Sequence, residues 1–110
     1  MDSTITGFHA HLYYDADSLG TARAVRDAAG EALPVEVGRL HEKPVGPHPM
    51  WSCQLAFGRD DFAEVVTWLA LHRRGLTVFV HPETGQALQD HRDHALWMGS
   101  MPALKLDMFN

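Results

Sequence analysis

The segment from Asp61 to Gly75 most constrains the fold, because it carries the start, the stripe and the stop of an amphipathic helix. Asp61 with Glu64 three residues later resembles a capping box, which begins a helix. A basic last turn followed by Gly75 is typical of a helix end. Between these signals apolar residues recur at helical spacing, at Phe62, Val65, Val66 and Leu69. The sequence therefore predicts a helix over residues 61–74.

Four strand patterns and a second helix surround this segment. Residues 7–14 (GFHAHLYY) alternate along a predicted strand, and residues 19–33 form a helical stripe that Pro34 ends. Further strands are expected over residues 35–42, 50–57 and 76–81. The order β-α-β-β-α-β is the split pattern of a ferredoxin-like sandwich. We therefore expect one α+β domain over residues 1–110, with both helices on one face of an antiparallel sheet.

The C-terminal part of the chain has weaker patterns. Residues 90–94 (DHRDH) predict a helical turn that reaches Trp97 and stops at Gly99. Leu104, Leu106 and Met108 alternate, so residues 103–109 form either an extra strand or an arm against a partner. A symmetric homodimer with the tail in its interface is expected, and the alternative is a tail that folds back over its own sheet.

Composition excludes several classes of protein. The 110 residues carry a net charge of −5 and no basic run, which argues against binding nucleic acid. The single cysteine, Cys53, excludes an internal disulfide, so a secreted disulfide scaffold is not expected. No apolar run is long enough for a membrane span, and the N-terminus lacks a signal-peptide pattern. The expected location is the cytoplasm.

Histidines are the unusual feature of the composition, with eight in the chain. His9 and His11 are two residues apart on a predicted strand, so both rings point to the same face. If the strand residues Phe8, Leu12, Trp51, Leu55, Phe57, Val78 and Val80 face the helices, the opposite face carries His9, His11, Tyr13, Ser52, Gln54, Thr77, Phe79 and His81. This pattern favours a functional site there, although two half-exposed histidines on a solvated face would give the same pattern.

His48, His81 and the pair Asp90–His91 each allow a functional and a purely structural interpretation. His48 lies between prolines in a stiff loop, where it is either a presented ligand or part of a plain turn. His81 ends a strand, where functional residues and simple polar stops both occur. Asp90 beside His91 is either a carboxylate that orients a base or an N-cap with its exposed first residue. Imidazoles without thiolates favour iron, zinc, copper or nickel over magnesium or calcium, and ligand chemistry leaves iron and zinc equally open.

Four motifs resemble the DOPA 4,5-dioxygenase family in order and spacing: FHAHLYYD (8–15), EKPVGPHP (42–49), VHPETG (80–85) and DHRDHALWMG (90–99). The resemblance runs from about residue 7 to residue 106. It implies a ferredoxin-like fold, iron(II), molecular oxygen and a catechol substrate. Among the histidines, His9, His11, His48, His81 and His91 match those of the motifs.

The sequence thus predicts an extradiol-type ring-cleaving dioxygenase that acts with iron(II) and oxygen on DOPA or a related catechol. His11, His48 and His81 are the expected metal ligands, because a sheet face, a rigid loop and a strand end can converge. His91, oriented by Asp90, is the expected base, and His9 is either a substitute ligand or a second base. The alternative is a non-catalytic dimeric protein that binds a metal or a phenol with the same face.

Overall fold

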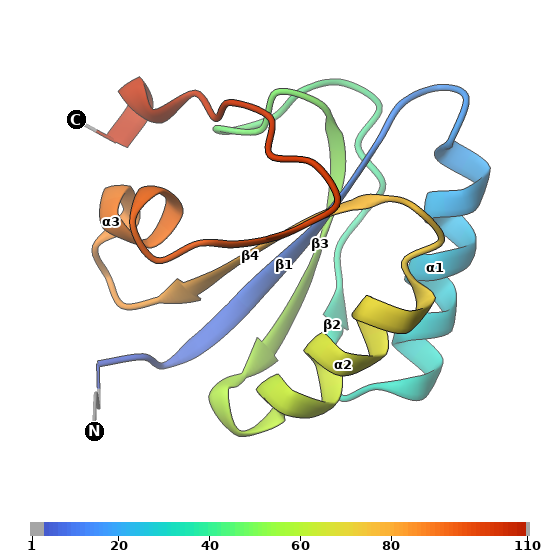
Figure 1. Ribbon diagram of the computed structural model, residues 1–110, viewed down its shortest axis with the longest axis horizontal. Coiled ribbons are helices and arrows are strands. Elements are labelled where there is room, and N and C mark those ends of the chain that lie inside the picture. The colour runs from blue at the N-terminus through green and yellow to red at the C-terminus, as the bar shows by residue number, and fades with distance from the viewer. Residues whose placement is uncertain (1–3, 110) are drawn as a thin grey trace.

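The computed structural model describes residues 4–109, which form a five-stranded antiparallel sheet with helices on both sides (Figure 1). The strands lie in the order β2-β3-β1-β4-β5. Their bounds are β1 Gly7–Tyr14, β2 Glu36–Val37, β3 Trp51–Gly58, β4 Thr77–Glu83 and β5 Leu96–Met98. The helices are α1 Leu19–Ala32, α2 Phe62–His72 and α3 Ala87–Arg92. The first four strands and the two longer helices reproduce the predicted ferredoxin-like order.

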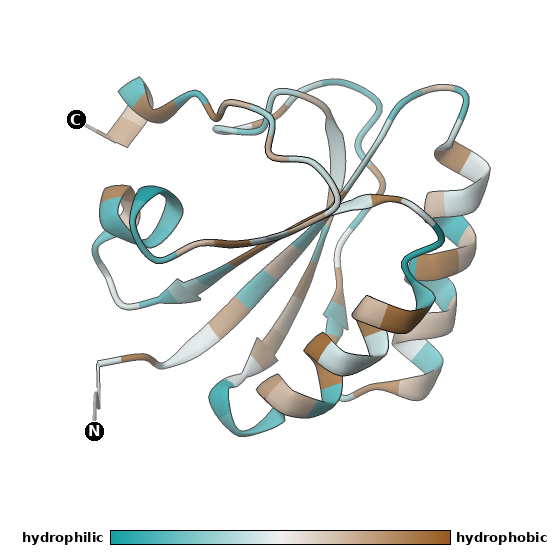
Figure 2. Ribbon diagram, viewed as in Figure 1, coloured by the Kyte–Doolittle hydropathy of each residue, from teal (hydrophilic) through white to brown (hydrophobic). Residues whose placement is uncertain are grey.

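The hydrophobic core lies between the sheet and helices α1 and α2, as the alternation of the strands predicts. Figure 2 shows apolar and polar residues alternating along β1. The helices contribute Val25 and Ala29 from α1, and Val65 and Leu69 from α2. The strands contribute Ala10, Leu12, Tyr14, Cys53, Leu55, Phe57, Val78 and Val80. Because this face buries the apolar set, the other face of β1 and β4 is left for the histidines.

Leu69→Ala is expected to lower the free energy of unfolding by about 2–5 kcal/mol, because it removes a fully buried side chain and leaves a cavity. Leu71→Ala is the matched control on the same helix, since Leu71 is 83% exposed. Urea denaturation of both variants measures the difference. Equal losses in the two would contradict the orientation of α2.

The structure corrects two predicted elements, the second strand and the C-terminal helix. The second strand is only two residues long, because the chain turns away after Val37. Beyond it, two isolated hydrogen bonds remain: the backbone N–H of Gly38 donates to the carbonyl of Gln54, and that of His41 donates to the carbonyl of Ser52. The C-terminal helix ends at Arg92 and does not reach Trp97. Trp97 lies instead in β5, which pairs with β4, so β4 is not an edge strand.

The C-terminal segment lies against its own chain. The backbone N–H of Lys105 donates to the carbonyl of Pro47, 2.9 Å away, and Leu106–Phe109 form a 3-10 turn rather than a strand. The ring of Phe109 packs on that of His91, with centroids 4.6 Å apart. The tail therefore folds back against its own chain, as in the alternative named above. Across residues 4–109, no helix has the length and apolar character needed to cross a membrane.

Candidate metal centre

Two neighbouring central strands bring three histidines together. His9 and His11 lie two residues apart on β1, and the antiparallel register of β1 and β4 sets His9 directly opposite His81. Residues opposite one another across a sheet point to the same face, so all three imidazoles lie on the face turned away from α1 and α2. The predicted grouping of His11 with His81 follows from this register.

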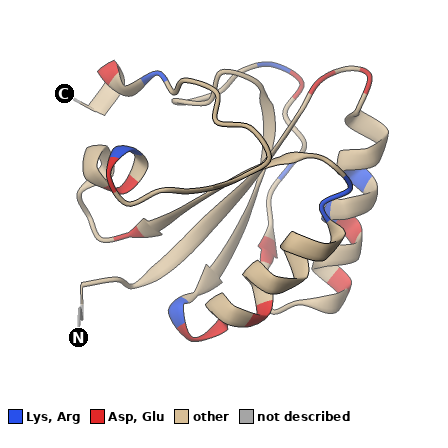
Figure 3. Cartoon of the chain, in the orientation of Figure 1, with Lys and Arg blue, Asp and Glu red and all other residues tan. Residues whose placement is uncertain are grey.

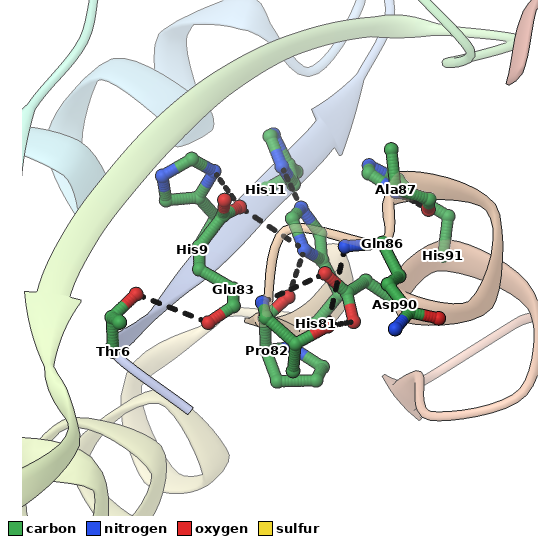
Figure 4. Close-up of polar contacts among 11 residues, drawn as sticks. Thr6, His9, His11, His81, Pro82, Glu83, Gln86, Ala87, Asp90 and His91 are labelled. Carbon is green, nitrogen blue, oxygen red and sulfur yellow. Dashed lines mark hydrogen bonds and ion pairs between the residues drawn. The ribbon is translucent and has the colours of Figure 1, made fainter. Parts of the chain in front are cut away.

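The imidazole nitrogens lie at the spacing of ligands to one ion. The Nε2 atoms of His11 and His81 are 3.1 Å apart, and one nitrogen from each of His9, His11 and His81 lies within 4.8 Å of the others (Figure 4). Two nitrogens about 2.1 Å from one ion and at a right angle to each other would be about 3.0 Å apart. This cluster, His9, His11 and His81, can therefore hold a metal ion.

Burial keeps the imidazoles of His11 and His81 neutral. Desolvation is the main cause that lowers the pKa of His11 well below its ordinary value, followed by the neighbouring histidines. Burial likewise lowers the pKa of His81 to about 4. The Nδ1 of His81 lies 3.0 Å from the carbonyl oxygen of Pro82, which only accepts, so Nδ1 carries the proton and Nε2 presents its lone pair to His11. Neutral imidazoles with free lone pairs are the donor set that iron and zinc accept.

These lowered pKa values predict an acid-sensitive metal-free protein. Burial lowers the pKa of both His48 and His81 from 6.5 to about 4, so the unfolded chain binds more protons between these pH values. The free energy of unfolding should fall as pH drops from 6.5 towards 4, by up to about 1.4 kcal/mol per pH unit for each imidazole. Urea denaturation at several pH values measures this slope. His48→Asn should reduce it and exposed His72→Asn should not, whereas a flat profile would contradict neutral buried imidazoles.

His48 reaches the cluster but has a different partner. Its ring centroid lies 4.2 Å from that of His11, and the side chain is 6% exposed. Its Nδ1 lies 2.7 Å from the hydroxyl of Tyr13. Burial raises the pKa of Tyr13 and lowers that of His48 to about 4, so the hydroxyl keeps its proton and donates it to Nδ1. Among the described residues, the group with ligand spacing contains His9, the alternative named from the sequence, and not His48.

His91 comes from α3 and stacks against the cluster, with its ring centroid 4.0 Å from that of His81. Its Nδ1 donates to the carbonyl of Ala87 at 2.7 Å, so its Nε2 carries the lone pair. The carboxylate of Asp90 accepts hydrogen bonds from the backbone N–H and the hydroxyl of Thr84, at 2.9 and 2.6 Å. The prediction that Asp90 orients His91 is therefore wrong, and so is the alternative that Asp90 is the N-cap of the helix. Asp90 fixes the turn between β4 and α3, and Ala87 orients the ring.

Glu83 is a site residue that the sequence analysis missed. Its carboxylate lies 3.0 Å from Nδ1 of His9 and 3.5 Å from Nδ1 of His81. The signal was present in the sequence, since Glu83 follows His81 by two residues on one strand and therefore shares its face. Figure 3 shows that β1, β3 and β4 otherwise carry no Lys, Arg, Asp or Glu.

A surface depression lies beside His9. It has a volume of about 490 Å³ and is lined by His9, Glu36, Ala56 and Glu83 among others. A second hollow, of about 460 Å³, is lined by Phe8, Phe62 and Leu96 and contains none of the clustered histidines. Of these two hollows, only the first includes a member of the cluster, and that member is His9.

The fold and the site define a small α+β protein whose central strands carry a buried imidazole cluster able to hold a metal ion. The family model described as the Dopa 4,5-dioxygenase family matches residues 8–108. The chain belongs to this family, as the four sequence motifs predict.

Individual relatives agree with this assignment. The chain is 31% identical to the DOPA 4,5-dioxygenase of Amanita muscaria, covering all of the chain but 51% of that protein. It is also 31% identical to an uncharacterized 21.2 kDa protein of Botryotinia fuckeliana, covering 98% of the chain and 66% of the relative. The chain thus spans about half and about two thirds of the lengths of these relatives.

A crystal structure from Nostoc punctiforme, provisionally described as a dioxygenase, matches nearly the whole fold. The TM-score is 0.94 at 46% identity, with 99% of this chain and 95% of the other covered. The family match and this structural neighbour therefore agree over nearly the whole chain.

Proposed function

We propose that the protein is an iron(II)-dependent extradiol-type dioxygenase that opens the ring of DOPA or a related catechol. The observation that carries the proposal is the cluster of three imidazoles at ligand spacing on β1 and β4, in a chain of the Dopa 4,5-dioxygenase family. His11 and His81 are the proposed ligands, with His9 as the third. His48, expected as a ligand, is proposed instead to act beside them as a hydrogen-bonding partner of Tyr13.

Iron(II), when bound, supplies Lewis acidity and the electron exchange that lets a catechol react with oxygen. Both oxygen atoms end in the ring-opened product, so the reaction needs no further reductant. The lone pair on Nε2 of His91 is available to accept a proton from a catechol hydroxyl. Phe109 over His91 and the buried Phe79 next to His81 exclude water from this part of the site.

Anaerobic loading with iron(II), followed by DOPA or a simpler catechol and then air, tests the proposal. We expect oxygen uptake in a one-to-one ratio with a yellow ring-opened product. Tight binding of the metal or the catechol without oxygen uptake would overturn the enzyme in favour of the non-catalytic binding protein.

We also propose that the protein is a homodimer. The tail retains exposed apolar side chains even after folding back, with Met101 73% and Met108 57% exposed. Light scattering on the full chain should give twice the mass of 12.3 kDa, and a monomer would contradict the proposal. The single-domain organisation over residues 1–110 and the cytoplasmic location stay predictions.

A further inference from the structure

Among the described residues, Glu83 provides the ion-pair contact through which a side chain restrains the ring of His9. The carboxylate oxygen lies 3.0 Å from Nδ1 of His9, whose side chain is 28% exposed, so packing alone restrains this ring less than those of His11 and His81. An ionised carboxylate only accepts hydrogen bonds. Nδ1 of His9 therefore carries the proton, and Nε2 keeps the lone pair.

The same arrangement recurs at the neighbouring imidazoles with a different acceptor. Nδ1 of His81 donates to the carbonyl of Pro82, and Nδ1 of His91 donates to the carbonyl of Ala87. His9 is the member of this set whose acceptor is a side chain, and that side chain also lies 3.5 Å from Nδ1 of His81 (Figure 4). The two nitrogens of an imidazole point away from each other, so a carboxylate at Nδ1 does not occupy the position in front of Nε2.

We propose that Glu83 is a positioning residue that fixes His9 in the Nδ1–H tautomer and so directs the Nε2 lone pair of His9 to the metal position. This inference rests on the proposed function, because it assigns His9 as a ligand. A carboxylate behind a metal-bound histidine orients the ring and raises its basicity, and losing such a partner typically weakens metal binding 10–100-fold. An ordinary half-exposed ion pair would leave metal binding unchanged.

Three variants separate these roles. Glu83→Ala removes the acceptor, and Glu83→Gln keeps an acceptor oxygen without the charge. Glu36→Gln is the matched control, because Glu36 is an exposed carboxylate that lines the same depression.

The first measurement is the imidazole ¹H–¹⁵N NMR spectrum of the metal-free protein at pH 8, which reports the tautomer of His9 without any metal or substrate. We expect the Nδ1–H tautomer in the wild type and in Glu83→Gln and Glu36→Gln, and a shift towards the Nε2–H tautomer in Glu83→Ala. A wild-type His9 in the Nε2–H form, or a tautomer that Glu83→Ala leaves unchanged, would overturn the inference.

The second measurement is titration with Co²⁺, followed by its visible absorption. We expect affinity to fall about 10–100-fold in Glu83→Ala, less in Glu83→Gln, and not at all in Glu36→Gln. Unchanged affinity in Glu83→Ala would overturn the role of Glu83 towards the metal. Failure of the iron-loaded wild type to consume oxygen would overturn the dioxygenase proposal alone, since neither measurement here depends on turnover.

Discussion

Replacing His11 by asparagine is expected to abolish metal binding at the cluster and to reduce ring-cleaving turnover by about 10³-fold or more. The physical reason is that Nε2 of His11 lies 3.1 Å from Nε2 of His81, which is the spacing of two ligands on one ion. Loss of a metal that supplies several kcal/mol of transition-state stabilisation corresponds to about a thousandfold in rate. Bound iron by elemental analysis and oxygen uptake measure the two effects.

His72→Asn is the control for this substitution, because His72 is an exposed histidine on α2, outside the cluster. It should retain both iron and activity. A His11→Asn protein that is folded by circular dichroism and keeps wild-type iron content would show that the metal lies elsewhere.

His91→Ala is expected to reduce turnover by about 10²–10⁴-fold and to leave the iron content nearly unchanged. The ring stacks on His81 at 4.0 Å but lies outside the group of His9, His11 and His81 that has ligand spacing. Steady-state kinetics with iron-loaded protein gives the loss, and elemental analysis gives the iron content. Activity and iron lost together would make His91 a ligand and not a base.

A companion variant separates the two neighbouring residues of α3. Asp90→Asn should impair the turn between β4 and α3, since the carboxylate accepts two hydrogen bonds from Thr84. Its main effect is therefore expected on the free energy of unfolding. A loss of activity without a loss of stability would show that Asp90 takes part in the reaction.

The part of the site that local periodicity determines could be predicted from the sequence. Strand alternation places His9 and His11 on one face, and the helical stripe of residues 61–74 assigns the other face to the core. Together these two patterns were enough to place His9 and His11 on the face opposite the core.

The rest of the site depends on contacts that local patterns do not contain. His48 as a ligand stays a prediction, whereas the position of His9 opposite His81 follows from the register of β1 with β4, which is a long-range property. Asp90 and His91 are adjacent on a helix, and consecutive helical residues do not face each other, so their pairing was misread. The three residues of β5 are too few for a periodic signal, which is why Trp97 was assigned to a helix.

The most direct test of the central claim is a crystal structure of the iron(II)-loaded protein, with anomalous diffraction measured at the iron edge. We expect one anomalous peak about 2.1 Å from a nitrogen of each of His9, His11 and His81. A peak bound through other residues, or no peak in protein that contains iron by elemental analysis, would contradict this expectation.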